Sequence, residues 1–410
     1  MDKKNKEIWF IDQYIGHPKY GNVYRNFYLA EELQKRNIKV RIFSGSYSHL
    51  RYNNPIVSGI CTTEILDGVE FNWIKIKNYG DGRSIGRVLS FFEFTSKLFF
   101  LRKEIGPEVI LTPSAPMVPF WLVYFFNKIY WNNKSKIIFE IRDIWPLTLI
   151  TLGKKKKYHP FIIFLSFTEK VAYKKVDYIV STLKLSYKHI ATITKKRPRF
   201  KWIDNGINIP DKTVQVPKEI LSLIPTDKFI IGYTGSLGLA NAMSYLIEAA
   251  NLIKHNTKVH FVLVGDGSDK KALMRKAKGL NNITFINKVE KNFIPGILSH
   301  FDALYFSYAN VPELYKYGVS ANKTYEYMIS GKPIILSTPK LEYNIIEIAQ
   351  CGIVIPPENS KSIYRAIHAL FLLSPEERAD MGKRGKEYIK RNNTFDILGD
   401  KLYKVINEVL

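Results

Sequence analysis

The second half of the chain contains the stretch YGVSANKTYEYMISGKPIIL, residues 317–336. It reads as a glycine turn, a short helix, a second glycine and a buried strand. Ser320 is the expected N-cap, because a serine side chain can accept from the unpaired amides of a first helical turn. Gly331 stands where a helix C-terminus favours a left-handed residue. The stretch therefore predicts a helix followed directly by a buried strand, which is typical of α/β domains.

The start of this helix has the features of an anion site. Asn322 and Lys323 fall in the first turn, where unpaired N–H groups, the helix dipole and a lysine charge all favour an anion. Glu326 shares this face roughly one turn along. A phosphate site with a carboxylate about 5 Å deeper suits the diphosphate and ribose of a nucleotide. The alternative is a surface helix with a Lys323–Glu326 ion pair, worth a few tenths of a kcal/mol.

Two further loops join a predicted strand to a helix through glycines. One follows the strand at 229–233, and the other ends the strand at 259–264. Glycines at such positions let backbone N–H groups approach a phosphate. Turns of this kind occur in any α/β domain, so each alone is weak support for a nucleotide site. The candidate residues in these loops are Gly235, Ser236, Gly238, Gly265 and Gly267.

Short β-branched or aromatic runs alternate with amphipathic helical stretches along the whole chain. At 410 residues the chain exceeds the length at which one core keeps growing, so two domains are expected. The alternation predicts a doubly wound parallel sheet in each, with ligands at the strand C-termini. The weakest periodicity, at 204–227, places the hinge. The expected strands are 7–11, 39–43, 71–76, 109–111, 136–140, 178–181, 200–203, 229–233, 259–264, 283–285, 303–306, 333–336 and 352–355.

The formal net charge of +24 is unevenly distributed. Residues 1–200 hold 34 Lys and Arg against 16 Asp and Glu, a balance of +18, whereas residues 201–410 hold 27 against 21, a balance of +6. A basic half attached to a nearly balanced half implies an anionic partner on one face. Cys61 and Cys351 form no metal-binding or redox spacing, and no signal sequence precedes the first expected strand. We therefore expect a cytoplasmic protein.

Three apolar stretches in the basic half are unusual for a soluble domain. Residues 88–103 can form an amphipathic helix, 116–131 are aromatic nearly all round, and 161–167 follow the run Lys154–Lys157. None reaches the length of about 20 apolar residues that spans a bilayer. Such helices suit docking on anionic lipid, but core helices beside a solvated lysine loop are the alternative. Nucleic acid is a competing anion, although no zinc spacing or RNA-binding aromatic signature accompanies the charge.

Four motifs carry a resemblance to a known enzyme family. They are IRDIWP at 141–146, YTGSLG at 233–238, VGDG at 264–267, and the elements SANK, EYM and GKP within 320–333. Together they resemble the retaining nucleotide-sugar glycosyltransferases of family 4, and within them the O-antigen and capsule branch that includes L-fucosamine transferases. The resemblance covers nearly the whole chain.

The family has the GT-B fold, in which two Rossmann-like doubly wound parallel-sheet domains face a cleft. The resemblance therefore implies an acceptor-binding domain at residues 1–206 and a nucleotide-sugar-binding domain at 207–390. A C-terminal helix at 391–410 is expected to pack back on the first domain. Family members retain the anomeric configuration without a bound metal, and the chain contains no Asp-x-Asp, so no cofactor is expected.

The resemblance assigns Glu326 to the ribose hydroxyls of the donor. The chain departs from the family pattern at Gly318, eight residues earlier, where the family has a second glutamate. Glu313 is near enough in sequence to replace it. The family's usual Arg and Lys after the first strand of the second domain correspond roughly to Ser236 and Asn241. Other groups must then neutralise the charge of the diphosphate, and Lys323 is the main candidate.

The expected reaction moves a sugar, by resemblance an N-acetylated amino or deoxy sugar, from a UDP-sugar to a polyprenyl-diphosphate-linked acceptor in surface polysaccharide synthesis. Lys323, the amides of Gly235 and Gly238, and the helix that starts near Ala321 would stabilise the leaving UDP. Asn322 and the turn at Gly265 and Gly267 complete the expected nucleotide site.

Acceptor binding is expected in the first domain. Asp143 and Glu140, near the end of the strand at 136–140, are candidates for binding or deprotonating the acceptor, and Arg142 between them could pair with either. The departing phosphate can itself take the acceptor proton, so no protein base is strictly required. The basic, aromatic domain would hold the lipid acceptor on the inner face of the cytoplasmic membrane, with no nucleic acid as partner. The other acceptor-side candidates are Gly21, Asn22 and Arg25.

Two other functions remain open. A UDP-sugar 2-epimerase shares the fold and the nucleotide site but needs no membrane-facing surface. A basic nucleic-acid-binding protein would explain the charge but would leave Glu326 and the glycine loops without a role.

Overall fold

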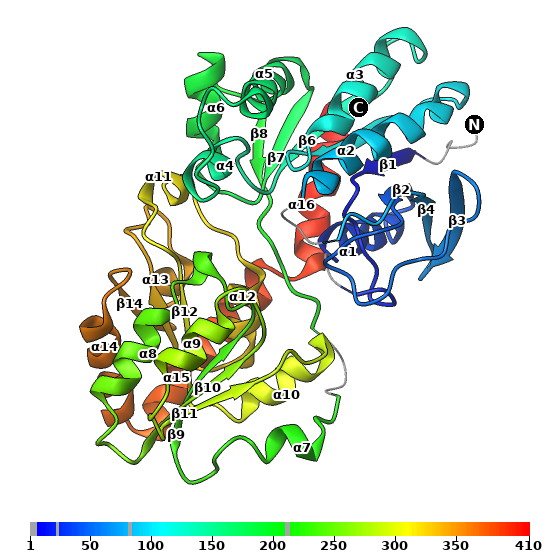
Figure 1. Ribbon diagram of the computed structural model, residues 1–410. Coiled ribbons are helices and arrows are strands. Elements are labelled where there is room, and N and C mark those ends of the chain that lie inside the picture. The colour runs from blue at the N-terminus through cyan, green and yellow to red at the C-terminus, as the bar shows by residue number, and fades with distance from the viewer. Residues whose placement is uncertain (1–5, 22–23, 81–83, 210–213) are drawn as a thin grey trace. The chain divides into compact units, whose positions relative to one another are not determined.

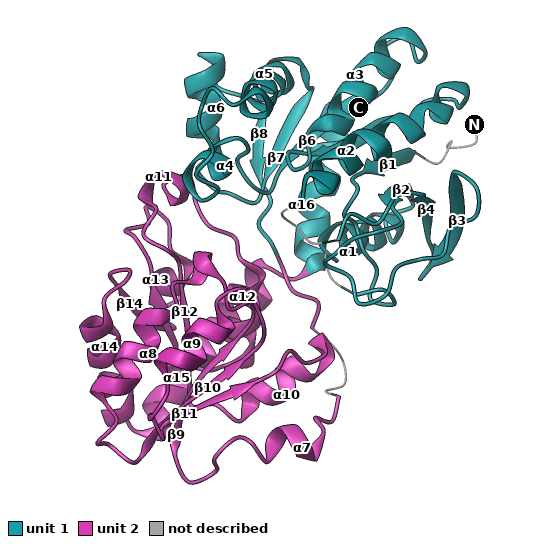
Figure 2. Cartoon of the chain, in the orientation of Figure 1, with its two compact units in different colours: residues 1–205, 395–410 teal, residues 206–394 magenta. Residues whose placement is uncertain are grey.

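The computed structural model describes residues 6–21, 24–80, 84–209 and 214–410, which form two compact units (Figures 1 and 2). Unit 1 comprises residues 1–205 and 395–410, and unit 2 comprises residues 206–394. The last helix, α16 (Phe395–Val409), is therefore part of unit 1. In sequence, the whole of unit 2 lies between this helix and the rest of unit 1.

Unit 1 is built on an eight-stranded sheet with the order β3-β4-β2-β1-β5-β6-β7-β8. Neighbouring strands pair in parallel except β3 and β4, which are antiparallel. The strands are β1 (Glu7–Ile11), β2 (Lys39–Gly45), β3 (Cys61–Leu66), β4 (Val69–Ile74), β5 (Val109–Pro113), β6 (Lys136–Ile141), β7 (Tyr178–Ser181) and β8 (Phe200–Trp202).

Helices cover both faces of this sheet. The side chains of β1 show the division: Ile8 and Phe10 share a buried cluster with α1 and α16, whereas Trp9 and Ile11 share one with α2 and α3. Successive side chains of a strand point to opposite faces, so the two helical layers lie on opposite sides. The remaining helices of unit 1 are α1 (Arg25–Gln34), α2 (Ile85–Lys97), the 3-10 helix η1 (Leu98–Lys103), α3 (Val118–Ile129), α4 (Leu147–Thr151), α5 (Pro160–Lys175) and α6 (Ser186–Thr194).

The antiparallel strand β3 is not among the expected strands. It forms a hairpin with β4 through Asp67 and Gly68, which have φ of +46° and +82°. An Asp-Gly pair is the residue choice for a two-residue hairpin turn with positive φ at both positions. Glu64 and Thr63 interrupt the apolar pattern of β3, so the run lacks the hydrophobicity by which the other strands are found.

Unit 2 contains a six-stranded sheet in which all strands are parallel, with the order β11-β10-β9-β12-β13-β14. Its strands are β9 (Phe229–Thr234), β10 (Val259–Val264), β11 (Ile283–Ile286), β12 (Ala303–Ser307), β13 (Ile334–Ser337) and β14 (Gly352–Ile355). Its helices are α7 (Lys218–Leu221), η2 (Leu239–Asn241), α8 (Ser244–Leu252), α9 (Lys270–Lys276), η3 (Lys291–Phe293), α10 (Ile294–Ser299), α11 (Pro312–Tyr315), α12 (Asn322–Ser330), α13 (Ile345–Ile348), α14 (Ser360–Leu372) and α15 (Pro375–Asn392).

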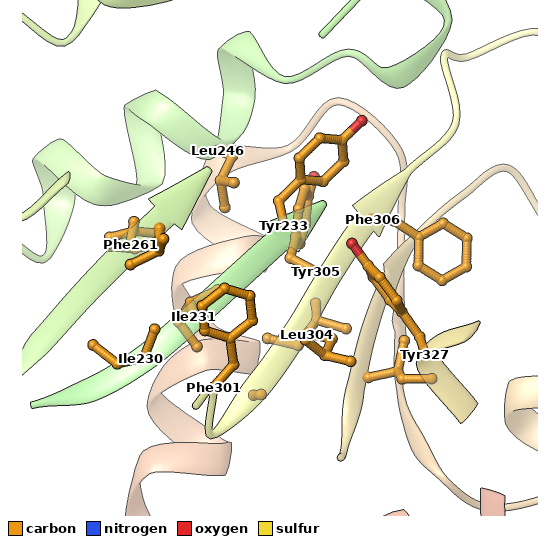
Figure 3. Packing of buried hydrophobic residues seen from close by; sticks show 14 of the residues in the cluster. Ile230, Ile231, Tyr233, Leu246, Phe261, Phe301, Leu304, Tyr305, Phe306 and Tyr327 are labelled. Carbon is orange, nitrogen blue, oxygen red and sulfur yellow. The ribbon is translucent and has the colours of Figure 1, made fainter. Parts of the chain in front are cut away.

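The core of unit 2 packs Tyr327 of α12 against the middle of the sheet, and Figure 3 shows this side chain beside Phe306. The rings of Tyr327 and Phe306 meet edge to face at 5.7 Å. The Tyr327 hydroxyl accepts from the Thr234 amide (2.7 Å) and donates to the Thr234 carbonyl (3.2 Å). A single buried tyrosine thus fixes the helix against the C-terminal end of β9, where the first glycine loop begins.

The predicted fold class is confirmed: each unit is an α/β layer structure on a predominantly parallel sheet. Every expected strand overlaps an observed one, and β3 is the addition. The apolar stretches of the basic half form α2 with η1, α3 and α5. Among the described residues, no helix has both the length and the apolar character needed to cross a membrane.

Candidate functional site

The two glycine loops of unit 2 lie against each other at the C-terminal ends of the neighbouring strands β9 and β10. The Gly235 amide donates to the Val264 carbonyl (2.9 Å), and the Leu237 amide donates to the Asp266 carbonyl (2.8 Å). Gly265 has φ +150°, and a Cβ there would lie 1.9 Å from the Gly235 carbonyl oxygen. Only glycine allows this approach of one backbone to another.

Some backbone amides of these loops donate to other protein groups, and some do not. Because the Gly235 amide is bonded to Val264, it does not serve the phosphate as expected. The Gly267 amide donates to the Asp266 carboxylate (2.8 Å). Within the described part of the chain, the amides of Ser236 and Gly238 donate to no protein group. Both are backbone donors that a ligand could use.

The helix α12 begins one residue later than expected. Ala321, with an extended ψ of 133°, is the N-cap residue, and Ser320 does not cap the helix. Among the residues that the structure describes, no side chain caps the first turn, so the amides of Asn322 and Lys323 remain for a ligand, as at other helix N-termini that bind anions. Gly331 ends the helix in the left-handed conformation (φ +74°), which confirms that prediction.

Lys323 reaches from α12 to the first glycine loop. Its Nζ donates to the Tyr233 hydroxyl (2.8 Å) and lies 4.0 Å from the centre of that ring. The same hydroxyl donates to the Ser236 carbonyl (2.5 Å), so one phenol connects the lysine to the loop. A Cβ at Gly235 would lie 2.9 Å from Nζ, and a side chain there would displace the lysine.

The buried amine of Lys323 has an environment that favours the binding of an anion. Loss of surrounding water lowers the pKa of Lys323 to about 7, and the charge of Glu326 only partly opposes this. Burial also raises the pKa of Tyr233 well above its usual value, so the phenol keeps its proton and cannot supply a counter-charge. Since burial without a counter-charge disfavours an ammonium, an arriving anion would stabilise the charged form.

Glu326 has a partner that the sequence did not indicate. Its carboxylate pairs with Lys291 of η3 at 3.0 Å, and Lys323 is directed to Tyr233. The surface pair Lys323–Glu326 is therefore not formed. Lys291 lies 35 residues earlier in a loop without a motif, so only the folded structure brings it to α12. Glu313 is exposed on α11.

In unit 1, Glu140 is held in a buried ion pair at the end of β6. It is 1% exposed, and its carboxylate accepts from Arg25 Nε (3.1 Å) and Asn26 Nδ2 (3.0 Å). Burial would raise the pKa of Glu140, but the charges of Arg25 and Arg142 outweigh it and lower the pKa. A carboxylate that is kept ionised and fully bonded favours a structural role over the expected role as a base.

The arginines of this cluster are likewise engaged within the unit. Arg25 is buried and also donates to the Asp204 and Ile203 carbonyls, so it anchors the end of β8 instead of reaching an anionic ligand as expected. Arg142 donates to Asp12, a buried carboxylate at the end of β1. Burial raises the pKa of Asp12, against the opposing charge of Arg142. Asp12 was missed because nothing in its sequence neighbourhood marks it.

Asp143 differs from its neighbours. It is half-buried, and its carboxylate accepts from the Thr148 hydroxyl (2.5 Å) at the start of α4. Burial raises the pKa of Asp143, although Thr148 and the Ile144 amide oppose the shift. Within the described residues it makes no ion pair with a cation. A carboxyl group with a raised pKa and no counter-charge is better suited to proton transfer near neutral pH than Glu140.

The loop after β1 is only partly described. Gly21 has φ +84°, and a Cβ there would lie 2.4 Å from the Tyr52 ring, so glycine is required by both its conformation and its packing. Asn22 lies outside the described residues. The two candidate clusters, around Lys323 in unit 2 and Asp143 in unit 1, each lie at the C-terminal ends of parallel strands, where α/β sheets bind ligands.

Comparison with known proteins finds a family match within the second unit. Residues 228–372 match the sequence model of the family described as "Glycosyl transferases group 1". No curated protein sequence matches the chain. The matched segment spans the glycine loops and α12, and thus every residue of the Lys323 cluster.

Solved structures share the whole fold at low sequence identity. Sucrose-phosphate synthase from Thermosynechococcus elongatus is 15% identical with a TM-score of 0.73, and the alignment covers 98% of this chain and 99% of that one. The E. coli "Trehalose-6-phosphate" structure bound with UDP-2-fluoro glucose is 10% identical with a TM-score of 0.73, covering 99% and 100%. Anabaena HepE in complex with UDP is 12% identical with a TM-score of 0.67, covering 98% and 100%. These likenesses establish the two-domain GT-B-like architecture.

Proposed function

We propose that the chain, a glycosyltransferase by the group 1 domain that residues 228–372 match, is a retaining transferase that uses a UDP-sugar. The proposed acceptor is linked to a polyprenyl diphosphate, and the proposed setting is O-antigen or capsule synthesis on the inner face of the cytoplasmic membrane. The sugar is proposed to be an N-acetylated amino or deoxy sugar. Unit 2 would bind the donor and unit 1 the acceptor.

The Lys323 cluster carries this proposal. A diphosphate there would meet one ammonium, the first-turn amides of α12 and the available amides of Ser236 and Gly238. When the sugar leaves, negative charge grows on the diphosphate, and donors that are already in place stabilise it without reorganisation. Glu326 lies on the same helix one turn along, where the ribose hydroxyls of the nucleotide would follow. The UDP complexes of two structural relatives support the choice of nucleotide.

Asp143 is the proposed contact for the acceptor hydroxyl. Its raised pKa and its lack of a cationic partner among the described residues suit a group that accepts a proton or a hydrogen bond from a sugar. The buried network of Arg25, Glu140 and Arg142 holds the ends of β1, β6 and β8 in place beneath it. No metal or cofactor is proposed.

The outer surface of unit 1 supports a membrane-bound acceptor. Exposed and partly buried rings on three neighbouring helices are in contact in two groups. Trp121 stacks on Phe125 (5.8 Å) and on Phe167 (5.7 Å), and Phe92 meets Phe164 (6.1 Å). The exposed run Lys154–Lys157 precedes α5. We call these residues the aromatic face. Exposed aromatic rings beside lysines favour the interface of an anionic bilayer.

The test is sugar transfer by the purified chain from a panel of UDP-sugars to a polyprenyl-diphosphate-GlcNAc analogue. Product from one donor is expected, and Glu326→Ala should abolish most of it. Glu347→Ala, a change of an exposed glutamate on another helix of the same unit, is the matched control. Interconversion of free UDP-sugars without transfer would replace the proposal with an epimerase. Retention on DNA without UDP binding would indicate the nucleic-acid alternative.

A further inference from the structure

A row of buried aromatic rings connects α2 to Asp143 in unit 1. The ring centres of Tyr14 and Phe91 are 6.4 Å apart, and those of Phe91 and Trp145 are 6.1 Å apart. Burial raises the pKa of Asp143, and a hydrogen bond from the Trp145 side chain is one of the contacts that oppose this shift. The row therefore ends at the carboxyl group that is proposed to meet the acceptor.

Arg87 of α2 lies at the other end of this row. Its Nε donates to the Tyr14 hydroxyl (2.9 Å), and its guanidinium lies 5.4 Å from the centre of the Tyr14 ring and 5.9 Å from that of Phe91. The residue is partly exposed, and it belongs to the first turn of α2, where the helix dipole adds positive charge. Arginine side chains recognise phosphate through paired N–H donors, so this position suits a phosphate ligand.

Arg87 and Asp143 lie at the same edge of the eight-stranded sheet. Tyr14 follows the C-terminal end of β1, Asp143 follows that of β6, and β5 lies between these two parallel strands. The Gln13 amide donates to the Ser90 hydroxyl (2.8 Å), which holds the start of α2 over the end of β1. Adjacent strands are about 4.8 Å apart, so the ends of β1 and β6 are roughly 10 Å apart. A distance of this size suits one sugar ring with a hydrogen-bonded group on either side.

An exposed apolar stripe runs from the same end of α2 to the aromatic face. It consists of Ile85, Leu89 and Phe92, whose spacing of four and three residues places them along one side of the helix. Phe92 belongs to the aromatic face through its contact with Phe164 of α5. A lipid that leaves a phosphate at the first turn of α2 would pass Ile85 and follow this stripe toward the surface that is proposed to meet the bilayer.

The geometry points to a subsite for the diphosphate of the lipid-linked acceptor at Arg87. We infer that Arg87 binds this diphosphate and that the attached sugar lies over the row of rings, with its reacting hydroxyl at Asp143. Because the distance suits one sugar ring, the acceptor is a lipid diphosphate that carries a single sugar. This inference rests on the proposed function, because it locates the diphosphate and sets the length of the proposed acceptor.

The first experiment follows the heat of binding of three soluble acceptor analogues to the full chain. Each carries GlcNAc on a farnesyl group, joined through a diphosphate, through a monophosphate or without phosphate. The diphosphate analogue is expected to bind most tightly. Arg87→Gln should weaken its binding by about tenfold or more, because a charged pair of donors is lost, and should leave binding of the phosphate-free analogue unchanged. Arg87→Lys, which keeps the charge without the paired donors, should fall between the wild type and Arg87→Gln.

The matched control is Arg102→Gln. Arg102 is also partly exposed and lies over an aromatic ring, that of Phe99 at 4.3 Å, but it belongs to η1, which leads to the start of β5 at the opposite edge of the sheet. The control should bind the three analogues as the wild type does. Equal weakening of all three analogues by Arg87→Gln would show a structural role for Arg87 and would overturn the subsite, as would an equal loss of diphosphate binding in the control.

A second readout separates this inference from the proposed function. In the transferase assay, Arg87→Gln should raise the KM for the diphosphate-linked acceptor and leave the KM for the UDP-sugar unchanged, and the wild type should prefer acceptors with one sugar to those with two. An unchanged acceptor KM, or equal use of both acceptor lengths, would overturn the inference while the function stands. Absence of transfer together with Arg87-dependent binding of the diphosphate analogue would support the subsite while the proposed function fails.

Discussion

At the scale of single residues, Lys323 predicts a pH dependence of donor binding. Burial lowers its pKa to about 7, and a bound diphosphate would raise it again. Binding should therefore take up a proton once the pH exceeds 7, and the Kd for a UDP-sugar should rise by up to about tenfold per pH unit above that point. A UDP-sugar suits the test, because its diphosphate does not titrate in this range.

The measurement is calorimetric titration with UDP-GlcNAc between pH 6 and 9, in buffers of different ionisation enthalpy. Lys323→Arg is the control, because a guanidinium remains charged throughout this range. Its Kd should be flat with pH. A wild-type Kd that is equally flat would contradict the assignment of Lys323 to the diphosphate.

We predict that the Tyr233 hydroxyl positions Lys323 and the first glycine loop for donor binding. Its hydroxyl is the acceptor for Lys323 Nζ and the donor to the Ser236 carbonyl, so Tyr233→Phe releases both the lysine and the loop. With about 1 kcal/mol for each lost hydrogen bond, donor affinity should fall by about 5- to 30-fold. Tyr343→Phe removes a hydroxyl that pairs with Tyr388 in the same unit, and it should leave donor affinity unchanged. Equal effects of the two changes would show that Tyr233 has only a structural role.

The residues of the candidate sites were only partly predictable. Asn322, Lys323 and Glu326 could be found because helix periodicity places them on one face of a short segment. Lys291, Tyr233 and Asp12 could not, since their roles arise from contacts between segments far apart in the sequence, which carry no local signal. The roles expected for Glu140 and Arg25 changed for the same reason: each is the other's partner, 115 residues away.

At the scale of elements, the paired glycine loops predict a difference between two glycines of unit 2. Gly265→Ala would place a Cβ 1.9 Å from the Gly235 carbonyl, whereas Gly279→Ala meets no atom within 4 Å. Both positions have positive φ, so both changes carry backbone strain of about 1–2 kcal/mol. Gly265→Ala must in addition separate the two loops, at a further cost of about 1–3 kcal/mol.

Urea denaturation of the two variants checks this difference, and UDP-sugar affinity provides the second readout. Gly265→Ala should be the less stable and should bind the donor weakly, because the loop that carries Ser236 and Gly238 moves. Equal stability and equal affinity of the two variants would mean that the loops can separate without consequence.

The elements themselves were largely predictable, because strands buried on both faces read as continuous apolar runs and glycines mark where they end. β3 was missed because it is an antiparallel strand with polar residues at Thr62, Thr63 and Glu64. The Asp67-Gly68 pair, which suits a hairpin turn, was the sequence signal that could have revealed it. The start of α12 was misplaced by one residue, since Ser320 has the better capping chemistry but Ala321 has the capping geometry.

At the scale of the molecule, the two units are interleaved in sequence. α16 buries Leu398, Leu402 and Ile406 in the core of unit 1, against α1 and with the ring of Phe395 near Tyr28 (4.8 Å). In sequence, the last helix of unit 1 therefore follows the whole of unit 2. Two Rossmann-like sheets could be inferred from periodicity alone, but the amphipathic pattern of the last helix does not say which sheet it covers.

The aromatic face of unit 1 leads to the last prediction, which concerns the membrane. Phe125 and Phe167 are 47% and 57% exposed and flank the ring of Trp121. Transferring apolar surface to a bilayer is worth about 25 cal/mol per Å², so replacing both rings with aspartate should weaken binding to anionic vesicles by tenfold or more. Ile105→Asp, at a residue that is 91% exposed elsewhere in the unit, is the control and should bind as the wild type does. Co-sedimentation with phosphatidylglycerol vesicles measures both, and added salt should weaken the wild type because Lys154–Lys157 contribute about 1 kcal/mol each near the surface. UDP-sugar affinity should be unaffected in both variants, since the donor cluster lies in unit 2. Vesicle binding that survives the loss of both rings would assign membrane contact to another surface and remove the main structural support for a lipid-linked acceptor.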